Sequence, residues 1–450
     1  MINLKPAKSL QGKLDLPTSP DLFLLTLTAS LALSKNLKIV SINETPYIKM
    51  WCDIFKNHLN IQWDGNSCLI DSHLEDPSSY LLVPFNQLPF RNLIVFTALG
   101  MGKVVSFKEI SQKRLETWCK NSKKFNIILE IVQHGDNYGL SVKEYPESFS
   151  DLTFIEEADL SMLLGFLMGI RRSASFQIDY PFSNPLRNLA SLLGFTITVK
   201  SAVSKDSDPI ARRLKFLQPK KRHSTTSGQQ YTVNIDFSQY TSADHIEISL
   251  PGDELLGSIM IAAKCLLPKG SFVINNMPLE TWASPLPGFI RKMGCKLSLQ
   301  ETNRTSFGST GMLSIQKSEL YGRKIECNPA ADYQPHLPAM VILAAFAEGQ
   351  SVFRDLEDLR NDDPDGIDQI EKCIRTLGAR HGEMPDGIVM EGGRDFDGFD
   401  LNESLPAAIS GSFATAALKC IGETNINDEL LCRRWPDFRN ILEQICEFRV

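Results

Sequence analysis

The stretch LPAMVILAAFAEGQSVFRDLEDLRNDDPDGIDQIEKCIRTLGA, residues 337–379, decides the fold class of this chain. Its alanine-rich apolar run Met340–Ala347 has the composition and length of a buried helix. Gly349 follows that run, and glycine suits the left-handed residue just past a helix end. The short run Ser351–Phe353 then predicts a strand, and a second helix is expected over Ile367–Leu377. The stretch therefore predicts a helix–strand–helix unit of an α/β protein.

The same unit recurs along the chain, which is the main finding from the pattern alone. Each copy is an apolar helix that leads into a strand and is followed by a second helix. The helix and strand are expected over Leu22–Ile42, Phe90–Phe107, Ala158–Ile178, Asp253–Ile274, Leu337–Phe353 and Leu405–Ile426. Two sets of three copies predict two pseudo-symmetric α/β domains, each of three repeats. The alternative is chance recurrence, because apolar helices often end in glycine.

Two proline-led turns indicate where the chain passes from one domain to the other. Pro17–Asp21 and Leu250–Asp253 each lead into an apolar helix. In the first turn, Ser19 is the expected N-cap, with Pro20 at the first helical position and Asp21 in the first turn. We therefore expect a first domain of residues 17–249 and a second domain of residues 1–16 and 250–450.

Composition restricts the class of protein and its partners. The chain has 450 residues, of which 43% are hydrophobic and 22% charged, as in soluble proteins with more than one core. A net charge of −6 provides no basic field for nucleic acid. The early apolar run Leu22–Leu33 is too short to cross a membrane, and no signal core precedes it. We expect a cytoplasmic monomer.

The cysteines and histidines indicate neither a metal site nor a cofactor. The 10 cysteines are scattered, no CxxC pair occurs, and the seven histidines are isolated. Scattered thiols of this kind are typical of reduced cysteines in a cytoplasmic protein. The acidic run 362–368 either binds a cation or caps the helix that follows, and we favour the cap. The basic stretch 201–230 is either an anion-binding loop or a solvated insertion, and we favour the insertion.

The second half of the sequence resembles the EPSP synthase family of enolpyruvyl transferases. LPGD at 250–253, before an alanine-rich helix, is similar to the family's PGD segment. LAAFAEGQSVFRDLEDLR at 343–360, MPDGIVMEGG at 384–393 and RRWPDF at 433–438 resemble further family segments in the same order. The resemblance implies two domains, each of three βαβαββ-type repeats, arranged as an inverse α/β prism. It also implies a small-molecule ligand in the interdomain cleft.

The departures from the family pattern bear on the chemistry. The family's first turn is PGSKS, whose lysine contacts phosphoenolpyruvate (PEP) and whose last serine contacts the acceptor. In this chain Pro20 and Asp21 stand at those two positions. The family's KExDR motif becomes DDPDG at 362–366, and its DHR motif becomes SGS at 410–412. Several cations of the family are therefore missing from this sequence.

Carried over position by position, the resemblance gives two sets of candidate site residues. The candidates for substrate binding are Ser19, Asp21, Arg91, Arg114 and Arg433. The candidates for acid–base catalysis are Asp159, Asp332 and Asp363.

The missing cations imply an altered function. PEP and shikimate 3-phosphate are polyanions that the family holds with lysine and arginine. A cleft that contains Asp21, Asp159 and Asp363 instead should repel PEP. One hypothesis is a divergent enolpyruvyl-transferase-like enzyme that acts in the cleft on a less anionic substrate. The other is a non-catalytic binding or scaffold protein that keeps the fold, and the sequence leaves both open.

Overall fold

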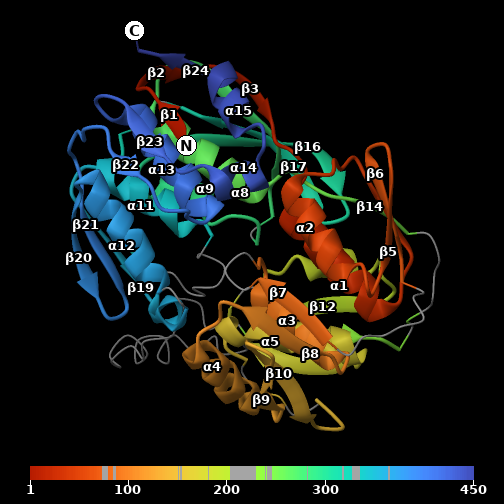
Figure 1. Cartoon of the computed structure of the whole chain (residues 1–450). Coiled ribbons are helices and arrows are strands. Elements are labelled where there is room, and N and C mark those ends of the chain that lie inside the picture. Colours follow the sequence, from red (N-terminus) through yellow and green to blue (C-terminus); the bar gives the residue numbers. More distant parts are fainter. Residues whose placement is uncertain are drawn as a thin grey trace, which may run out of the picture.

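The computed structural model describes most of the chain and shows the same repeated unit throughout. The described residues are 1–72, 80–84, 88–149, 152, 155–180, 182–202, 230–238, 240, 246–280, 282–316, 319–326, 335–362 and 365–449. In Figure 1 the elements of the second half, together with the N-terminal strands, lie above α3, α5 and their sheets. Within the described ranges, no helix has both the length and the apolar content needed to span a bilayer.

The first half of the chain contains three helix–strand units around three buried helices. The buried helices are α1 (Pro20–Leu33), α3 (Arg91–Gly100) and α5 (Glu157–Ile170), and the second helices are α2 (Pro46–Phe55), α4 (Gln112–Ser122) with the short η2 (Lys123–Phe125), and α6 (Leu186–Ala190). The buried helices contact one another, so they are apolar on all sides instead of along one stripe.

Three sheets accompany these helices, with strand orders β14-β4-β6-β5, β7-β8-β10-β9 and β11-β13-β12. The strands are β4 (Leu37–Val40), β5 (Asn60–Asp64), β6 (Ser67–Asp71), β7 (Tyr80–Pro84), β8 (Val104–Lys108), β9 (Ile128–His134), β10 (Asn137–Glu144), β11 (Ala174–Ile178), β12 (Thr196–Ala202), β13 (Gln230–Asp236) and β14 (Ile246–Ser249). β7 and β8 are parallel and flank α3 in the chain, whereas β9 and β10 form an antiparallel hairpin. This unit thus combines a helical crossover with a hairpin.

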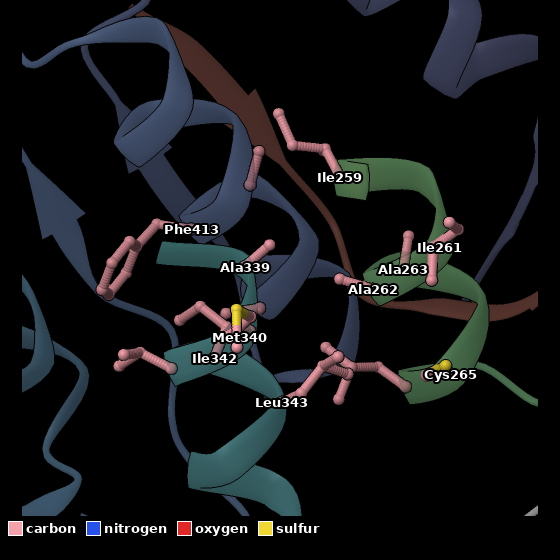
Figure 2. Packing of buried hydrophobic residues seen from close by; sticks show 14 of the residues in the cluster. Ile259, Ile261, Ala262, Ala263, Cys265, Ala339, Met340, Ile342, Leu343 and Phe413 are labelled. Atoms are coloured by element: carbon pink, nitrogen blue, oxygen red, sulfur yellow. The ribbon is translucent and has the colours of Figure 1, made fainter. Parts of the chain in front are cut away.

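The second half repeats this arrangement. Its buried helices are α8 (Glu254–Leu266), α11 (Leu337–Phe346) and α13 (Ala407–Lys419), and the other helices are α9 (Leu286–Lys292), η3 (Glu357–Asn361), α12 (Gly366–Leu377), α14 (Glu429–Arg434) and α15 (Phe438–Ile445). Figure 2 shows side chains of α8, α11 and α13, among them Ile259, Leu343 and Phe413, gathered where these helices face one another.

The strands of this half form sheets of order β16-β17-β15-β3, β18-β19-β21-β20 and β1-β23-β22, with a short β2-β24 pair. They are β1 (Ile2–Leu4), β2 (Ala7–Leu10), β3 (Gly12–Asp15), β15 (Phe272–Pro278), β16 (Leu297–Thr305), β17 (Gly308–Ile315), β18 (Lys324–Glu326), β19 (Gln350–Arg354), β20 (Arg380–Met384), β21 (Gly387–Glu391), β22 (Asp400–Leu401), β23 (Thr424–Ile426) and β24 (Cys446–Phe448). The predicted α/β fold with six helix–strand repeats is confirmed.

The strand pairings near residues 17 and 250 show to which half each flanking segment belongs. β3, near the N-terminus, pairs in parallel with β15, and β14 pairs in parallel with β4. The buried hydrophobic residues form two clusters. One contains residues from Ile2–Leu16 and Leu255–Ile445, and the other contains Leu22–Leu250 together with Phe307. These pairings and clusters support domain boundaries near residues 17 and 250, which remain a prediction.

Glycines allow α3 and α5 to pack backbone to backbone. A Cβ atom added at Gly165 would lie 2.3 Å from the carbonyl oxygen of Leu93, and one at Gly169 would lie 2.3 Å from that of Thr97. No carbon atom fits at such a distance from an oxygen, so a larger residue would force the helices apart. This close contact fixes the position of α3 against α5 in the first half.

Candidate functional site

A cavity of about 480 Å³ lies between the two halves. Its lining is mostly apolar and includes Leu88, Phe90, Leu93, Leu255, Trp282, Pro338, Ile370 and Ile409. The polar lining residues include Asp21, Arg91, Asn184, Glu254, His336, Asp362 and Arg434. An apolar cavity of this size with a few polar groups has the usual character of a small-molecule site.

Arg434 connects the two halves on one side of the cavity. It is the last residue of α14, and its Nη1 and Nη2 donate to the Asp21 Oδ1 and Oδ2 atoms at 2.7 and 2.9 Å. Nη2 also lies 3.2 Å from Oδ2 of Asp253, the N-cap of α8. Burial alone would lower the pKa of Arg434, but Asp21 and Asp253 raise it. The guanidinium is therefore fixed as a cation between two carboxylates from different halves.

Glu254 is the third buried carboxyl group of this cluster. Ser19, the N-cap of α1, donates from its Oγ to Glu254 Oε2 at 2.9 Å. Burial, together with the charges of Asp21 and Asp253, raises the pKa of Glu254 to about 8. Because Arg434 already balances the neighbouring carboxylates, Glu254 is protonated at neutral pH and presents an O–H donor.

A second ion-pair cluster joins the halves on the other side of the cavity. Arg91 Nη1 donates to the two carboxylate oxygens of Asp362 at 2.9 and 3.0 Å. Arg114 donates to Asp362 Oδ1 from Nε at 3.0 Å and from Nη2 at 2.7 Å. Arg114 Nη1 also donates to the carboxylate of Asp358 at 2.8 and 2.9 Å. Two arginines of the first half thus surround carboxylates that belong to the second half.

Burial makes this second cluster strong. The side chains of Arg114 and Asp362 are 3% and 6% exposed, so water screens the pair little. Burial alone would raise the pKa of Asp362, but Arg91 and Arg114 hold that pKa below its usual value. Asp362 therefore stays ionised and occupies both guanidinium groups.

Two further polar residues of the lining, His336 and Tyr47, are uncharged. Burial lowers the pKa of His336 to about 4, and its Nδ1 lies 2.9 Å from Ser258 Oγ. Burial and the charge of Asp21 raise the pKa of Tyr47, so this phenol stays protonated. Both groups are neutral near pH 7, and the cavity has no titrating histidine there.

The structure places the predicted substrate-binding residues in different surroundings. Asp21 and Arg91 line the cavity, but Arg434 and Asp362 are their respective partners. Ser19 and Arg114 lie behind the lining, and their side chains bind Glu254 and the Asp358–Asp362 pair. Arg433 is not a lining residue. Its side chain is half-exposed and pairs with Glu429 at 3.6 Å.

The predicted acid–base residues do not come together among the described residues. Asp159 lies outside the lining, with Lys124 Nζ 2.5 Å from its Oδ2. Asp332 and Asp363 lie outside the residues that the structure describes. In the same acidic run, Asp365 accepts hydrogen bonds from the backbone N–H groups of Ile367 and Asp368, which is the expected helix cap. Most of the basic stretch 201–230 is also outside the described residues.

The sequence did not single out Arg434, Glu254, Asn184 or Trp282 as site residues. Arg434 follows Arg433, the residue that the motif indicated, and successive residues of a helix point about 100° apart. Arg433 therefore faces solvent while Arg434 faces Asp21. The only available signal was the pair of adjacent arginines, and the turn of α14 decides which one enters the cavity.

The fold and the cavity between its halves define the class of protein. The crystal structure of EPSP synthase from Acinetobacter baumannii aligns with 100% of this chain at a TM-score of 0.67 and 14% identity, and 99% of that chain is covered. The enolpyruvyl transferase NikO from Streptomyces tendae aligns with 99% of this chain at a TM-score of 0.63, also with 14% identity, and 98% of NikO is covered. The chain therefore has the enolpyruvyl transferase fold.

Sequence comparison identifies the family. The family model for EPSP synthase (3-phosphoshikimate 1-carboxyvinyltransferase) matches residues 192–442, which is more than half of the chain. The 3-phosphoshikimate 1-carboxyvinyltransferase of Acaryochloris marina is 26% identical over 199 residues, and that of Brevibacillus brevis is 29% identical over 205 residues. Each match covers 44% of this chain, and the matched parts span 45% and 47% of those relatives, about half of their length. The chain belongs to the EPSP synthase family.

Proposed function

We propose that this chain binds an uncharged small molecule in the cavity between its halves and does not transfer an enolpyruvyl group from PEP. The observation that carries the proposal is the pairing of Arg91 and Arg114 with Asp362. These arginines are two of the three cations, with Arg433, that the family resemblance assigned to anion binding. A carboxylate of the chain itself takes the place of a bound anion, so the cavity offers no open cationic site there.

Competition makes binding of PEP at these arginines unfavourable. A free anion would have to displace a carboxylate that is attached to the same chain and therefore has a high effective concentration. Displacement would also leave Asp362, whose side chain is 6% exposed, as an unpaired buried charge. On the other side of the cavity, Arg434 is already balanced by Asp21 and Asp253. The charges therefore favour a neutral ligand over a polyanion.

The positions of the carboxyl groups favour binding over catalysis. Asp159 is paired with Lys124 away from the lining, and Asp21 is paired with Arg434. A general base needs a carboxylate within hydrogen-bond reach of the reacting atom, and these groups are committed elsewhere. The non-catalytic hypothesis is therefore our main proposal, with the cavity as its ligand site.

One observation supports altered catalysis as the second candidate. Glu254 lines the cavity, and its pKa of about 8 keeps it protonated at neutral pH. A buried carboxylic acid of this kind is able to act as a general acid toward a neutral substrate. Turnover that Glu254→Gln abolishes, without loss of ligand affinity, would establish this candidate over pure binding.

Two experiments test the main proposal. In thermal-shift measurements, millimolar PEP and shikimate 3-phosphate should leave the melting temperature unchanged, whereas both should stabilise the Acinetobacter baumannii enzyme as a matched control. In a strain that lacks EPSP synthase, this chain should fail to support growth without aromatic supplements, while the control gene restores growth. Full complementation, or stabilisation by micromolar PEP, would overturn the proposal.

A further inference from the structure

We propose that the cavity selects a ligand that carries hydrogen-bond acceptors, of the class of ketones, esters and lactones, because two residues that line it, one from each half, carry amide and indole N–H donors without acceptors among the described residues. This inference deepens the proposed function and rests on it. The first donor is Asn184, which lines the cavity and is only 6% exposed. Its Oδ1 accepts from the backbone N–H of Leu186 at 3.0 Å, which fixes the orientation of the amide.

That orientation leaves the Asn184 amide nitrogen directed away from the backbone N–H of Leu186. Among the described residues, the structure records no acceptor for this NH2 group. The protein therefore leaves this amide nitrogen without an acceptor of its own. A ligand in the cavity that carries an acceptor would supply one.

The second donor is Trp282, which comes from the other half of the chain. It lies in the loop before α9 and lines the same cavity, with its ring 6.4 Å from that of Phe307. Its Nε1 atom is buried and has no hydrogen-bond partner among the described residues. An indole N–H only donates, so the complementary ligand group must be an acceptor.

Glu254 adds a third donor to the lining of the cavity. Its Oε2 already accepts from Ser19 Oγ at 2.9 Å, and its protonated form presents an O–H. Of the carboxylates that line the cavity, Asp21 and Asp362 are occupied by arginines, and Glu109 is exposed. These donors are therefore set in a mostly apolar surface beside the paired charges, which matches a carbonyl oxygen on an apolar frame.

Three isosteric probes separate the contribution of the hydrogen-bond acceptor to binding from the contribution of charge. Acetophenone carries the carbonyl acceptor, α-methylstyrene replaces that oxygen by a CH2 group, and benzoate carries a charge. We expect acetophenone to bind more tightly than α-methylstyrene by roughly 2- to 12-fold for each hydrogen bond gained. We expect benzoate to bind the most weakly. The chain has five tryptophans, so indole 15N–1H spectra resolve individual side chains.

Variants of the lining residues test whether the preference for acetophenone arises in the cavity. Acetophenone should shift the indole resonance that disappears in Trp282→Phe, and this variant should lose much of the preference for acetophenone. Trp63→Phe is the matched control, because Trp63 packs on Phe23 and is not a lining residue. Asn184→Asp keeps the oxygen that accepts from Leu186 but removes the NH2 donor. It should weaken the binding of acetophenone and strengthen the binding of the isosteric cation 1-phenylethylamine. This comparison keeps the inference testable if Trp282→Phe does not fold.

The outcomes distinguish this inference from the proposed function. Equal affinity for acetophenone and α-methylstyrene would overturn the acceptor inference and leave the neutral cavity standing. Benzoate as the tightest probe would overturn the proposed function and the inference together. Failure of every probe at millimolar concentration would also overturn both, because an open apolar cavity of about 480 Å³ accommodates an aromatic ring.

Discussion

The substitution Asp362→Asn tests whether the second ion-pair cluster holds the halves together and blocks anions. The carboxylate accepts four hydrogen bonds from Arg91 and Arg114, and its side chain is 6% exposed. Removing one partner of a buried ion pair costs about 3–5 kcal/mol, since the other charges stay buried. We expect urea denaturation of Asp362→Asn to show a loss of this size at pH 7.

The pH dependence gives a second check on the same variant. The pKa of Asp362 lies below its usual value in the folded protein, so its stabilising effect is present above the unfolded pKa of about 4. That effect disappears as the pH falls through the lower, folded pKa. The difference between wild type and variant should therefore be constant from pH 5 to 7 and shrink below about pH 4.

Anion binding by the variant completes the test. With Asp362 neutral, Arg91 at the cavity lining loses this carboxylate while Arg114 keeps Asp358, so millimolar PEP or phosphate should raise the melting temperature of the variant and not of the wild type. Asp368→Asn is the control, because that side chain is 52% exposed and its pairing with Arg360 is worth less than about 1 kcal/mol. A loss below about 1 kcal/mol in Asp362→Asn would refute the reasoning.

Three further predictions concern the other carboxyl cluster and the core. The wild type should lose stability relative to Glu254→Gln as the pH rises from about 4.5 to 8, and the difference should be constant above pH 8, because the pKa of Glu254 is raised to about 8 in the folded protein. In urea denaturation across that range, the free energy of unfolding should fall by at most about 1.4 kcal/mol per pH unit. Gly165→Ala should destabilise by about 1–3 kcal/mol despite its better helix propensity, because the new methyl group meets Leu93; an unchanged urea midpoint would contradict this contact. Leu343→Ala, at a fully buried position, should cost about 2–5 kcal/mol in the same assay with an unchanged denaturant slope.

The repeated fold was predictable from the sequence because its signals are local. The composition of Met340–Ala347 and the glycine after it specify a buried helix and its end without knowledge of any distant residue. The N-cap role of Ser19 was predictable for the same reason, and the structure shows it accepting from the N–H of Leu22 at 3.3 Å. Periodicity and capping are properties of neighbouring residues, so the six units follow from the sequence.

The state of the candidate site was decided by the tertiary structure. The sequence indicated that cations of the family were missing, and it named Arg91, Arg114 and Arg433 as the candidates that remained. It did not show that Asp362, about 250 residues away in the chain, would lie within 3.0 Å of Arg91 and Arg114 and neutralise them. Such a contact depends on how the two halves meet, and no local pattern encodes it. Long-range packing therefore determines which charges a ligand in the cavity would meet. Short-range periodicity in the sequence determines the fold that forms the cavity.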